Sequence, residues 1–217
     1  MRHQPHLFIP RPWSDEVLQA GSDHQRHLDR VLRYPEGGAI SYTDGAGTFG
    51  IGVWNGTSVE RGDESEVDRI AVDLTMAVAP PRSKERQRFV VEKLQELGVS
   101  RLVWIITERG QTRAPRSDRS TAWAISALEQ SRGAWLMDVT DSRFSDLPNP
   151  VVADMAGAPI SSIWSELDGL TIAVGPEGGF SDFEVTMFSR TVGLGSGVLR
   201  TETAAVAAAA AVLLGRS

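Results

Sequence analysis

The sequence V-G-P-E-G-G-F-S-D-F-E at residues 174–184 decides how the second half of the chain folds. It follows an apolar run at residues 170–174, and glycine or proline fills four of the five positions at residues 175–179. Ser181 and Glu184 then form an S-x-x-E capping box, which is a common start of a helix. The stretch therefore predicts a strand, a tight loop and a helix, as in alternating α/β proteins.

A second stretch, L-G-S-G-V-L-R-T-E-T-A at residues 194–204, repeats this pattern, with a helix expected to begin near Arg200. Loops that leave the carboxyl ends of parallel strands are the usual ligand sites of such proteins, and glycine lets backbone groups approach a ligand closely. Neither loop has the lysine of a nucleoside triphosphate loop or the G-x-G-x-x-G spacing of a dinucleotide fold. For the first loop, a tight connection without a ligand is the alternative.

Length and composition are typical of a globular protein with one domain or two. The chain has 217 residues, a formal net charge of −6 and no cysteine. The absence of cysteine excludes disulfides and thiolate metal sites, and we predict no metal site. No apolar stretch reaches the roughly 18 residues of a membrane span, and the proline-rich start has no signal-peptide run. We therefore expect a cytoplasmic protein with no membrane partner.

The charge is unevenly distributed along the chain. Residues 80–143 hold twelve Lys or Arg against eight Asp or Glu, whereas residues 144–217 hold three against eight. The acidic total argues against nucleic acid as a partner, because phosphate contacts come from basic surfaces. The basic middle region is nevertheless compatible with an RNA-facing surface, and a solvated helix face explains it equally well.

The first 68 residues read as a small, mostly β domain. Asp44-Gly45 and Asn55-Gly56 are hairpin signals, since such turns need positive φ. The acidic residues 63–68 suit a connection, so we place a domain boundary near residue 68. Residues 23–33 look helical. The strand candidates are residues 6–9, 39–43 and 48–54.

Strands and helices alternate after residue 68, which predicts a parallel α/β sheet. Gly98 is the expected C-cap of the first helix in this region. The helix candidates are residues 85–97 and 118–131. The strand candidates are residues 69–78, 102–106, 135–139, 151–153 and 170–174.

The paired motifs GPEGGF-S-x-x-E and LG-x-x-x-LRTETA closely resemble those of the RsmE-type ribosomal RNA methyltransferases. Shorter matches extend the resemblance over nearly the whole chain: H-x-x-x-V-L-R at residues 27–33, K-x-x-E-L-G-V at residues 93–99 and E-Q-S-R at residues 129–132. That family belongs to the SPOUT class. The resemblance implies a PUA-like RNA-binding β-barrel at residues 1–68, and at residues 69–217 a SPOUT methyltransferase domain, a parallel sheet with a C-terminal trefoil knot.

The resemblance also implies an activity, the S-adenosyl-L-methionine-dependent methylation of uridine N3 in small-subunit (16S) ribosomal RNA. Such a transfer needs donor and acceptor held close and in line. Three glycine-bearing strand exits would form the cofactor pocket. The expected cofactor-binding residues are Asp154, Met155, Gly175, Pro176, Glu177, Gly178, Gly179, Leu194, Gly195, Val198, Leu199 and Thr203. For Glu177, bracing of the loop through amide N–H groups is the alternative.

Two residues of the second motif are the catalytic candidates. Arg200 stands at a helix start, where the helix dipole favours an anion, so a cation there suggests an external anionic partner. We expect Arg200 to stabilise charge developing on an everted uracil and Glu202 to accept the N3 proton. An ion pair of Arg200 with Glu202, or with another carboxylate, is the alternative.

The expected partners are 16S ribosomal RNA or the small ribosomal subunit, and the resemblance implies a homodimer. The candidate RNA-binding residues are Arg30, Arg33, Arg119, Gln130 and Arg132. Plain solvation is an equally good explanation for Arg30 and Arg33. Two other functions stay open: a SPOUT enzyme that acts on tRNA, and a catalytically silent RNA-binding or ribosome-assembly protein. The acidic tail suggests the silent protein, as does Gly197, where the family usually has arginine.

Overall fold

The computed structural model describes residues 4–13, 15–69, 72–164, 169–188 and 190–215 of the chain. The chain divides into two compact units. Unit 1 consists of Met1–Arg69 together with Leu128–Leu136, and unit 2 consists of Ile70–Ala127 and Met137–Ser217. A short segment from the middle of the sequence therefore packs with the amino-terminal residues.

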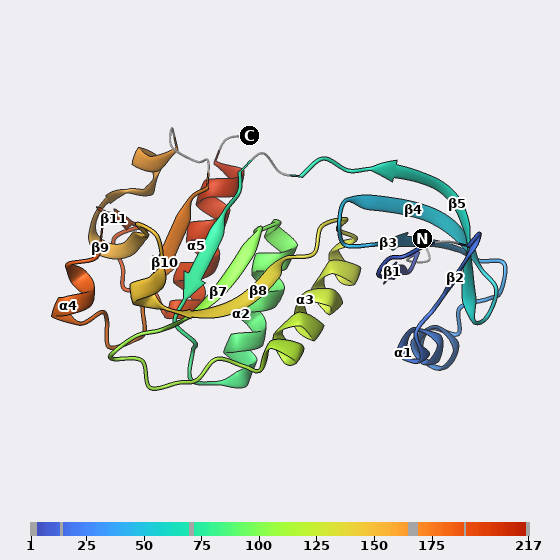
Figure 1. Ribbon diagram of the computed structural model, residues 1–217, viewed down its shortest axis with the longest axis horizontal. Helices are drawn as coiled ribbons and strands as arrows, with labels where there is room; N and C mark the ends of the chain where they lie inside the picture. The colour runs from blue at the N-terminus through green and yellow to red at the C-terminus, as the bar shows by residue number, and fades with distance from the viewer. Residues whose placement is uncertain (1–3, 14, 70–71, 165–168, 189, 216–217) are drawn as a thin grey trace. The chain divides into compact units, whose positions relative to one another are not determined.

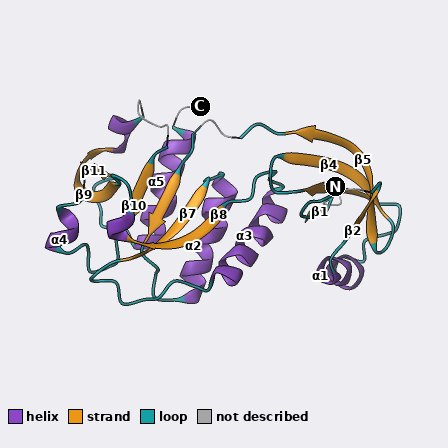
Figure 2. Cartoon of the chain, viewed as in Figure 1, coloured by secondary structure: helices purple, strands orange, loops and turns teal. Residues whose placement is uncertain are grey.

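Unit 1 is built on a five-stranded sheet with the order β1-β3-β4-β5-β2. Its strands are β1 (His6–Phe8), β2 (Val17–Gln19), β3 (Ala39–Thr43), β4 (Thr48–Trp54) and β5 (Ser58–Glu66). The pair β1 and β3 is parallel, and the other pairs are antiparallel. Figure 2 shows this unit as strands and loops beside the helical segment α1 (Ser22–Arg26), which continues as a π-helical turn at His27–Val31.

The strands at β1, β3 and β4 and the helical segment confirm the sequence predictions, whereas β2 and β5 were not predicted. The acidic residues 63–66 were expected in a connection but belong to β5, where they pair with β4. These residues are exposed, and among them Glu64 pairs with Arg61 and accepts a hydrogen bond from Tyr42. The polar sequence therefore led to the wrong prediction of a connection, because β5 has an apolar residue only near its start.

The turn between β3 and β4 is held by a buried carboxylate. Asp44 accepts hydrogen bonds from the backbone N–H groups of Ala46 (2.8 Å) and Thr48 (3.1 Å) and from the Arg11 guanidinium (2.6 Å). Burial by itself raises the pKa of Asp44, but these hydrogen bonds outweigh it and hold the pKa below its ordinary value. Gly45 has φ +74°, as the predicted hairpin turn requires.

Residues 128–136 are joined to the rest of unit 1 by specific hydrogen bonds. The Glu129 carboxylate accepts the N–H of Phe8 (2.9 Å) and lies 2.7 Å from the His24 ring. His6 hydrogen-bonds the carbonyl oxygen of Gly133 over 3.0 Å. Trp135 forms an isolated backbone bridge with Ala46 and donates its indole N–H to the carbonyl oxygen of Val67 (2.8 Å), so this tryptophan pairs within unit 1 and is not part of the strand predicted at residues 135–139. That strand begins three residues later.

Unit 2 contains a six-stranded parallel sheet with the order β11-β9-β10-β6-β7-β8 (Figure 1). Its strands are β6 (Thr75–Val78), β7 (Arg101–Ile106), β8 (Asp138–Arg143), β9 (Val151–Pro159), β10 (Thr171–Val174) and β11 (Arg190–Gly193). All of the pairs between these strands are parallel. The predicted parallel α/β architecture is therefore confirmed, and the carboxyl ends of neighbouring strands meet along one edge.

Unit 2 contains the helices α2 (Lys84–Leu97), α4 (Asp182–Val185) and α5 (Thr201–Leu214), together with most of α3 (Ser117–Ser131), whose last residues belong to unit 1. Ser83 caps the start of α2, and Gly98 ends it with φ +83°, as predicted. Helix α5 packs against α2, β6 and β10 (Figure 1). Its buried residues include Ala205, Ala208 and Ala209, whose small side chains allow this close approach. Within the described part of the chain, no helix is long and apolar enough to cross a membrane.

Candidate functional site

Two cavities lie at the loops of unit 2, and the first is formed by β9, the segment after β11 and the start of α5. It holds about 400 Å³ of empty space, part of it open to solvent. Its lining residues are Ala153, Asp154, Met155, Leu194, Gly195, Gly197, Val198, Leu199 and Ala204. Six of the residues predicted to bind the cofactor are among them: Asp154, Met155, Leu194, Gly195, Val198 and Leu199.

The walls of this first cavity are largely apolar and depend on glycine. Met155 and Val198 are exposed, which leaves their side chains available to a ligand. Gly195 has φ +138°, a conformation that disfavours other residues. A Cβ on Gly157 would lie 2.5 Å from the backbone of Val192, so glycine permits the close pairing of β9 and β11. An apolar pocket with a few polar groups, here the Asp154 carboxylate, is typical of a small-molecule site.

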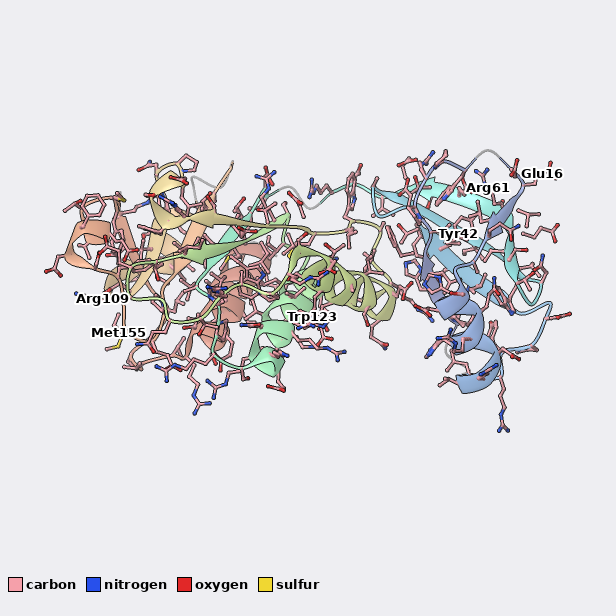
Figure 3. All side chains as sticks on the ribbon, turned by 60° about the horizontal axis from the view of Figure 1, so that its bottom comes forward. Glu16, Tyr42, Arg61, Arg109, Trp123 and Met155 are labelled. Atoms are coloured by element: carbon pink, nitrogen blue, oxygen red, sulfur yellow. The ribbon has the colours of Figure 1, made fainter. Side chains whose placement is uncertain are left out.

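The second cavity lies at the carboxyl ends of β10, β6 and β7, which are neighbours in the sheet. Its lining residues are Pro80, Pro81, Arg82, Arg109, Gln111, Thr112, Pro176, Glu177, Gly178, Thr201 and Glu202. Three of the predicted cofactor-binding residues, Pro176, Glu177 and Gly178, therefore line this cavity and not the first. In the view of Figure 3, Arg109 of the second cavity and Met155 of the first lie at the same end of unit 2.

The first turn of α5 separates the two cavities. Thr201 and Glu202 line the second, whereas Ala204 lines the first. The Thr201 hydroxyl donates a hydrogen bond to the carbonyl oxygen of Gly175 over 3.0 Å. The two glycine-bearing stretches that were singled out in the sequence thus meet in space.

An ion-pair network surrounds the carboxylates of the second cavity. Arg86 of α2 lies 3.3 Å from Glu202 and 3.7 Å from Glu177, and Arg82 lies 3.6 Å from Glu177. Glu177 is therefore held by guanidinium groups, and its side chain accepts no amide N–H bond among the described residues. The partner of Glu202 is Arg86, so the suggested pairing of Arg200 with Glu202 is wrong.

Glu184 joins two loops of the site and was not recognised as a linking residue in the sequence. Its carboxylate accepts the N–H of Ser181 (2.8 Å), which completes the predicted capping box, and the N–H of Glu108 (2.9 Å) after β7. Glu184 is buried, and this pair of bonds satisfies both of its oxygens. The loop after β10 is thereby tied to the loop that carries Arg109.

The remaining predicted residues of the second motif and the glycine loop lie near the cavities without lining them. Arg200 is exposed at the N-cap of α5 and makes no ion pair among the described residues. Thr203 is exposed in the first turn of the same helix. Gly179 has φ +69° at the end of its loop. Gly175 packs against the ring of Phe180, where a Cβ would lie 2.7 Å from a ring carbon.

The predicted RNA-binding residues are all exposed. Arg30, Arg33, Gln130 and Arg132 belong to unit 1, and Arg119 belongs to unit 2 at the start of α3. Arg132 donates a hydrogen bond to the carbonyl oxygen of Gln4, which fixes part of its guanidinium.

Arg82, Arg86 and Arg109 are site residues that the sequence motifs did not identify. A usable signal existed for two of them, because Arg82 and Arg109 closely follow the ends of β6 and β7, where ligand-binding loops are expected. Metal-binding groups are absent from the described residues: no cluster of three His, Asp or Glu is placed to hold an ion.

Comparison with known proteins assigns the chain to a family. The family model of an RNA methyltransferase domain matches residues 68–213, which include all of the strands of unit 2 and both cavities. The chain belongs to this family. The six-stranded sheet and the two cavities described above therefore lie within an RNA methyltransferase domain.

The similarity to known proteins extends beyond the methyltransferase domain. Ribosomal RNA small subunit methyltransferase E of Rickettsia conorii is 28% identical over 220 residues, which cover 91% of this chain and 89% of that protein. The enzyme of the same name from Synechocystis is 26% identical over 215 residues, which cover 86% of this chain and 69% of that protein. The resemblance to the RsmE type is confirmed.

A solved structure agrees with the whole chain. Ribosomal RNA small subunit methyltransferase E of Neisseria gonorrhoeae, bound to S-adenosyl methionine, is 27% identical, with a TM-score of 0.85 over 96% of each chain. The predicted fold class, a small β unit followed by a SPOUT-like parallel sheet, is therefore confirmed.

Proposed function

We propose that this protein is an S-adenosyl-L-methionine-dependent methyltransferase that modifies N3 of a uridine in small-subunit (16S) ribosomal RNA. The observation that carries the proposal is the meeting of the GPEGG loop and the LRTET helix start between two cavities, in a domain of the RNA methyltransferase family. Relatives named for this activity match nearly the full length of the chain.

The residues of the first cavity fit the cofactor. Gly195 and Gly197 leave room for a ligand beside the backbone, Met155 and Val198 offer apolar contact, and Asp154 offers a carboxylate to ribose hydroxyls. Gly175, Pro176, Glu177, Gly178, Gly179 and Thr203 complete the proposed binding set from the neighbouring loop and helix. S-adenosyl-L-methionine, when bound, supplies the methyl group.

Arg200 and Glu202 are the proposed catalytic residues. Glu202 is only 11% exposed and lies at the second cavity, so its carboxylate can accept the N3 proton in a site with little water. Arg200 is exposed at the adjoining helix start and is available to stabilise negative charge on the uracil. Arg86 holds Glu202 in place through their ion pair.

The remaining expectations form part of the same proposal. Residues 1–68 form a PUA-like domain and residues 69–217 a SPOUT domain. Unit 1, which also contains residues 128–136, grips ribosomal RNA through Arg30, Arg33, Gln130 and Arg132, and Arg119 of unit 2 adds a further contact. The carboxyl end of that domain forms a trefoil knot. A second copy of the chain completes the RNA surface as a homodimer, and the protein works in the cytoplasm on 16S rRNA or the small ribosomal subunit.

Calorimetry and nucleoside analysis together test the proposal. Titration with S-adenosyl-L-methionine should give heat of binding, whereas a catalytically silent RNA-binding protein need give none. Small-subunit rRNA from a strain that lacks the gene should be missing one 3-methyluridine. A missing methyl group in tRNA, with the rRNA unchanged, would instead support the alternative enzyme.

A further inference from the structure

Two guanidinium groups line the second cavity at the ends of adjacent strands. Arg82 follows β6 after Pro80 and Pro81, and Arg109 follows β7. Both side chains are largely exposed, Arg82 at 66% and Arg109 at 51%. Glu202, in contrast, is 11% exposed. Where it meets solvent, the cavity therefore has two guanidinium groups beside the half-exposed Glu177 carboxylate, and it has the Glu202 carboxylate at a buried position.

The ion pairs of these arginines are long. Arg82 lies 3.6 Å from Glu177, and Arg109 lies 3.5 Å from Asp182. Charge-assisted hydrogen bonds measure about 2.7–2.9 Å. Arg11, Arg61 and Arg88 elsewhere in the chain approach their carboxylates to 2.6 or 2.7 Å. The guanidinium groups at the second cavity thus keep donor capacity for a ligand.

The backbone holds both arginines in place. The N–H of Glu108, next to Arg109, is bound by the buried Glu184 carboxylate over 2.9 Å. Two consecutive prolines precede Arg82 and restrict φ on its amino-terminal side. A Cβ added to Gly178 would lie 3.7 Å from the Cβ of Arg109, so the loops after β7 and β10 are close. Fixed positions reduce the entropy lost on binding.

We propose that the second cavity is a nucleotide-binding subsite in which Arg82 and Arg109 bind backbone phosphates of the RNA beside the target base. A guanidinium fork matches the oxygens of a phosphate, and Glu202 lies further in, where a base can present N–H groups. Gln111 and Thr112 add hydrogen-bonding groups for the sugar. This assignment rests on the proposed function, because it supplies the RNA contact next to the methyl-transfer site.

The test compares two double variants of the full-length protein. Arg82→Gln with Arg109→Gln removes the proposed phosphate contacts. The matched control is Arg88→Gln with Arg101→Gln, which removes the same charge from side chains of similar exposure, 55% and 53%, outside the cavity. Filter binding measures the affinity of each protein for transcribed 16S rRNA between about 50 and 200 mM KCl.

The cavity variant should bind the RNA at least about tenfold more weakly than the control. Its slope of log affinity against log salt should be smaller by about 0.7 for each phosphate of single-stranded RNA that the variant no longer neutralises. Restoring the charge with lysine at both positions should restore the slope. Equal affinity and slope in the two double variants would overturn the subsite.

Parallel titration with S-adenosyl-L-methionine separates this inference from the proposed function. The cavity variant should bind the cofactor as the wild type does, since neither arginine lines the first cavity and Arg86 still pairs with Glu177. Normal cofactor and RNA binding in the cavity variant would contradict the subsite alone. A wild-type protein that binds neither the cofactor nor the RNA would contradict the proposed function itself.

Discussion

The hydroxyl of Thr201 donates a hydrogen bond to the carbonyl oxygen of Gly175 over 3.0 Å, and so joins two loops that are far apart in the sequence. Gly175 begins the loop after β10, and Thr201 begins α5, whose first turn separates the two cavities. The bond therefore fixes the position of each cavity relative to the other.

Thr201→Val should weaken cofactor binding. The substitution keeps the shape of the side chain but removes the hydroxyl, which leaves the Gly175 carbonyl without this donor and costs about 1 kcal/mol. We expect about fivefold weaker binding of S-adenosyl-L-methionine by calorimetry. Thr201→Ser keeps the hydroxyl and serves as the control. Equal affinities of the valine and serine variants would show that the bond does not position the cofactor site.

Glu184→Gln should destabilise unit 2. One carboxylate oxygen is replaced by an NH₂ group, so either the Ser181 or the Glu108 N–H faces another donor in a buried site. The expected loss is about 1–3 kcal/mol in the free energy of unfolding, measured with urea. Asp23→Asn, which weakens an exposed ion pair with Arg26, should cost at most about 1 kcal/mol. A glutamine variant as stable as this control would contradict the linking role.

Gly157→Ala should destabilise the pairing of β9 and β11. The new Cβ would lie 2.5 Å from backbone atoms of Val192, which cannot move without separating the strands. We expect a loss of about 1–3 kcal/mol in the free energy of unfolding. Gly197→Ala is the matched control, because a Cβ at that position meets nothing within 4 Å and its backbone has no positive φ. Equal stability of the two variants would refute the close approach of β9 and β11.

Asp44→Asn should remove part of the pH dependence of the stability of unit 1. The pKa of Asp44 is lower in the folded protein than its ordinary value of 3.8, so the ionised carboxylate stabilises the fold above about pH 4. That stabilisation is lost as the pH falls through the folded-state pKa. Urea unfolding should show a large difference between wild type and variant at about pH 7 and a smaller one below about pH 4. A difference that stays constant with pH would contradict the assigned charge state.

Arg200→Ala should reduce methyl transfer much more than cofactor binding. The guanidinium is proposed to act on charge that develops only during the reaction, so its loss should lower kcat by about 100-fold or more. Calorimetry with S-adenosyl-L-methionine should show an affinity within about twofold of the wild type, because Arg200 lies outside the first cavity's lining. Unchanged kcat would remove Arg200 from the catalytic residues.

Local sequence signals predicted much of the fold because they act over a few residues. The Ser181 and Glu184 capping box, the Gly98 C-cap and the Gly45 turn all formed as expected. The start of β8 was predicted too early, because Trp135 hydrogen-bonds Val67 in unit 1. Such contacts join residues that are far apart in the sequence, and no periodicity reports them.

The candidate site likewise depends partly on local motifs and partly on contacts between residues that are far apart in the sequence. Residues 154–157, 175–179 and 194–199 were assigned to one pocket from the sequence, and six of the predicted residues, from β9 and the segment after β11, line the first cavity. Pro176 and Glu177 line the second cavity whereas Met155 lines the first, and this division depends on the strand order, in which β10 stands between β9 and β6. The contributions of Arg82, Arg86 and Arg109 likewise follow from which strands are neighbours. Sequence motifs identified the loops, and the sheet topology decides which loops face the same cavity.

Methyl transfer in vitro tests the central claim most directly. The purified protein is incubated with labelled S-adenosyl-L-methionine and small ribosomal subunits from a strain that lacks the gene, and the rRNA is digested and analysed by mass spectrometry. We predict that 3-methyluridine appears in the 16S rRNA and depends on both the protein and the cofactor. Absence of methyl transfer, or a label found only on ribose, would contradict the claim.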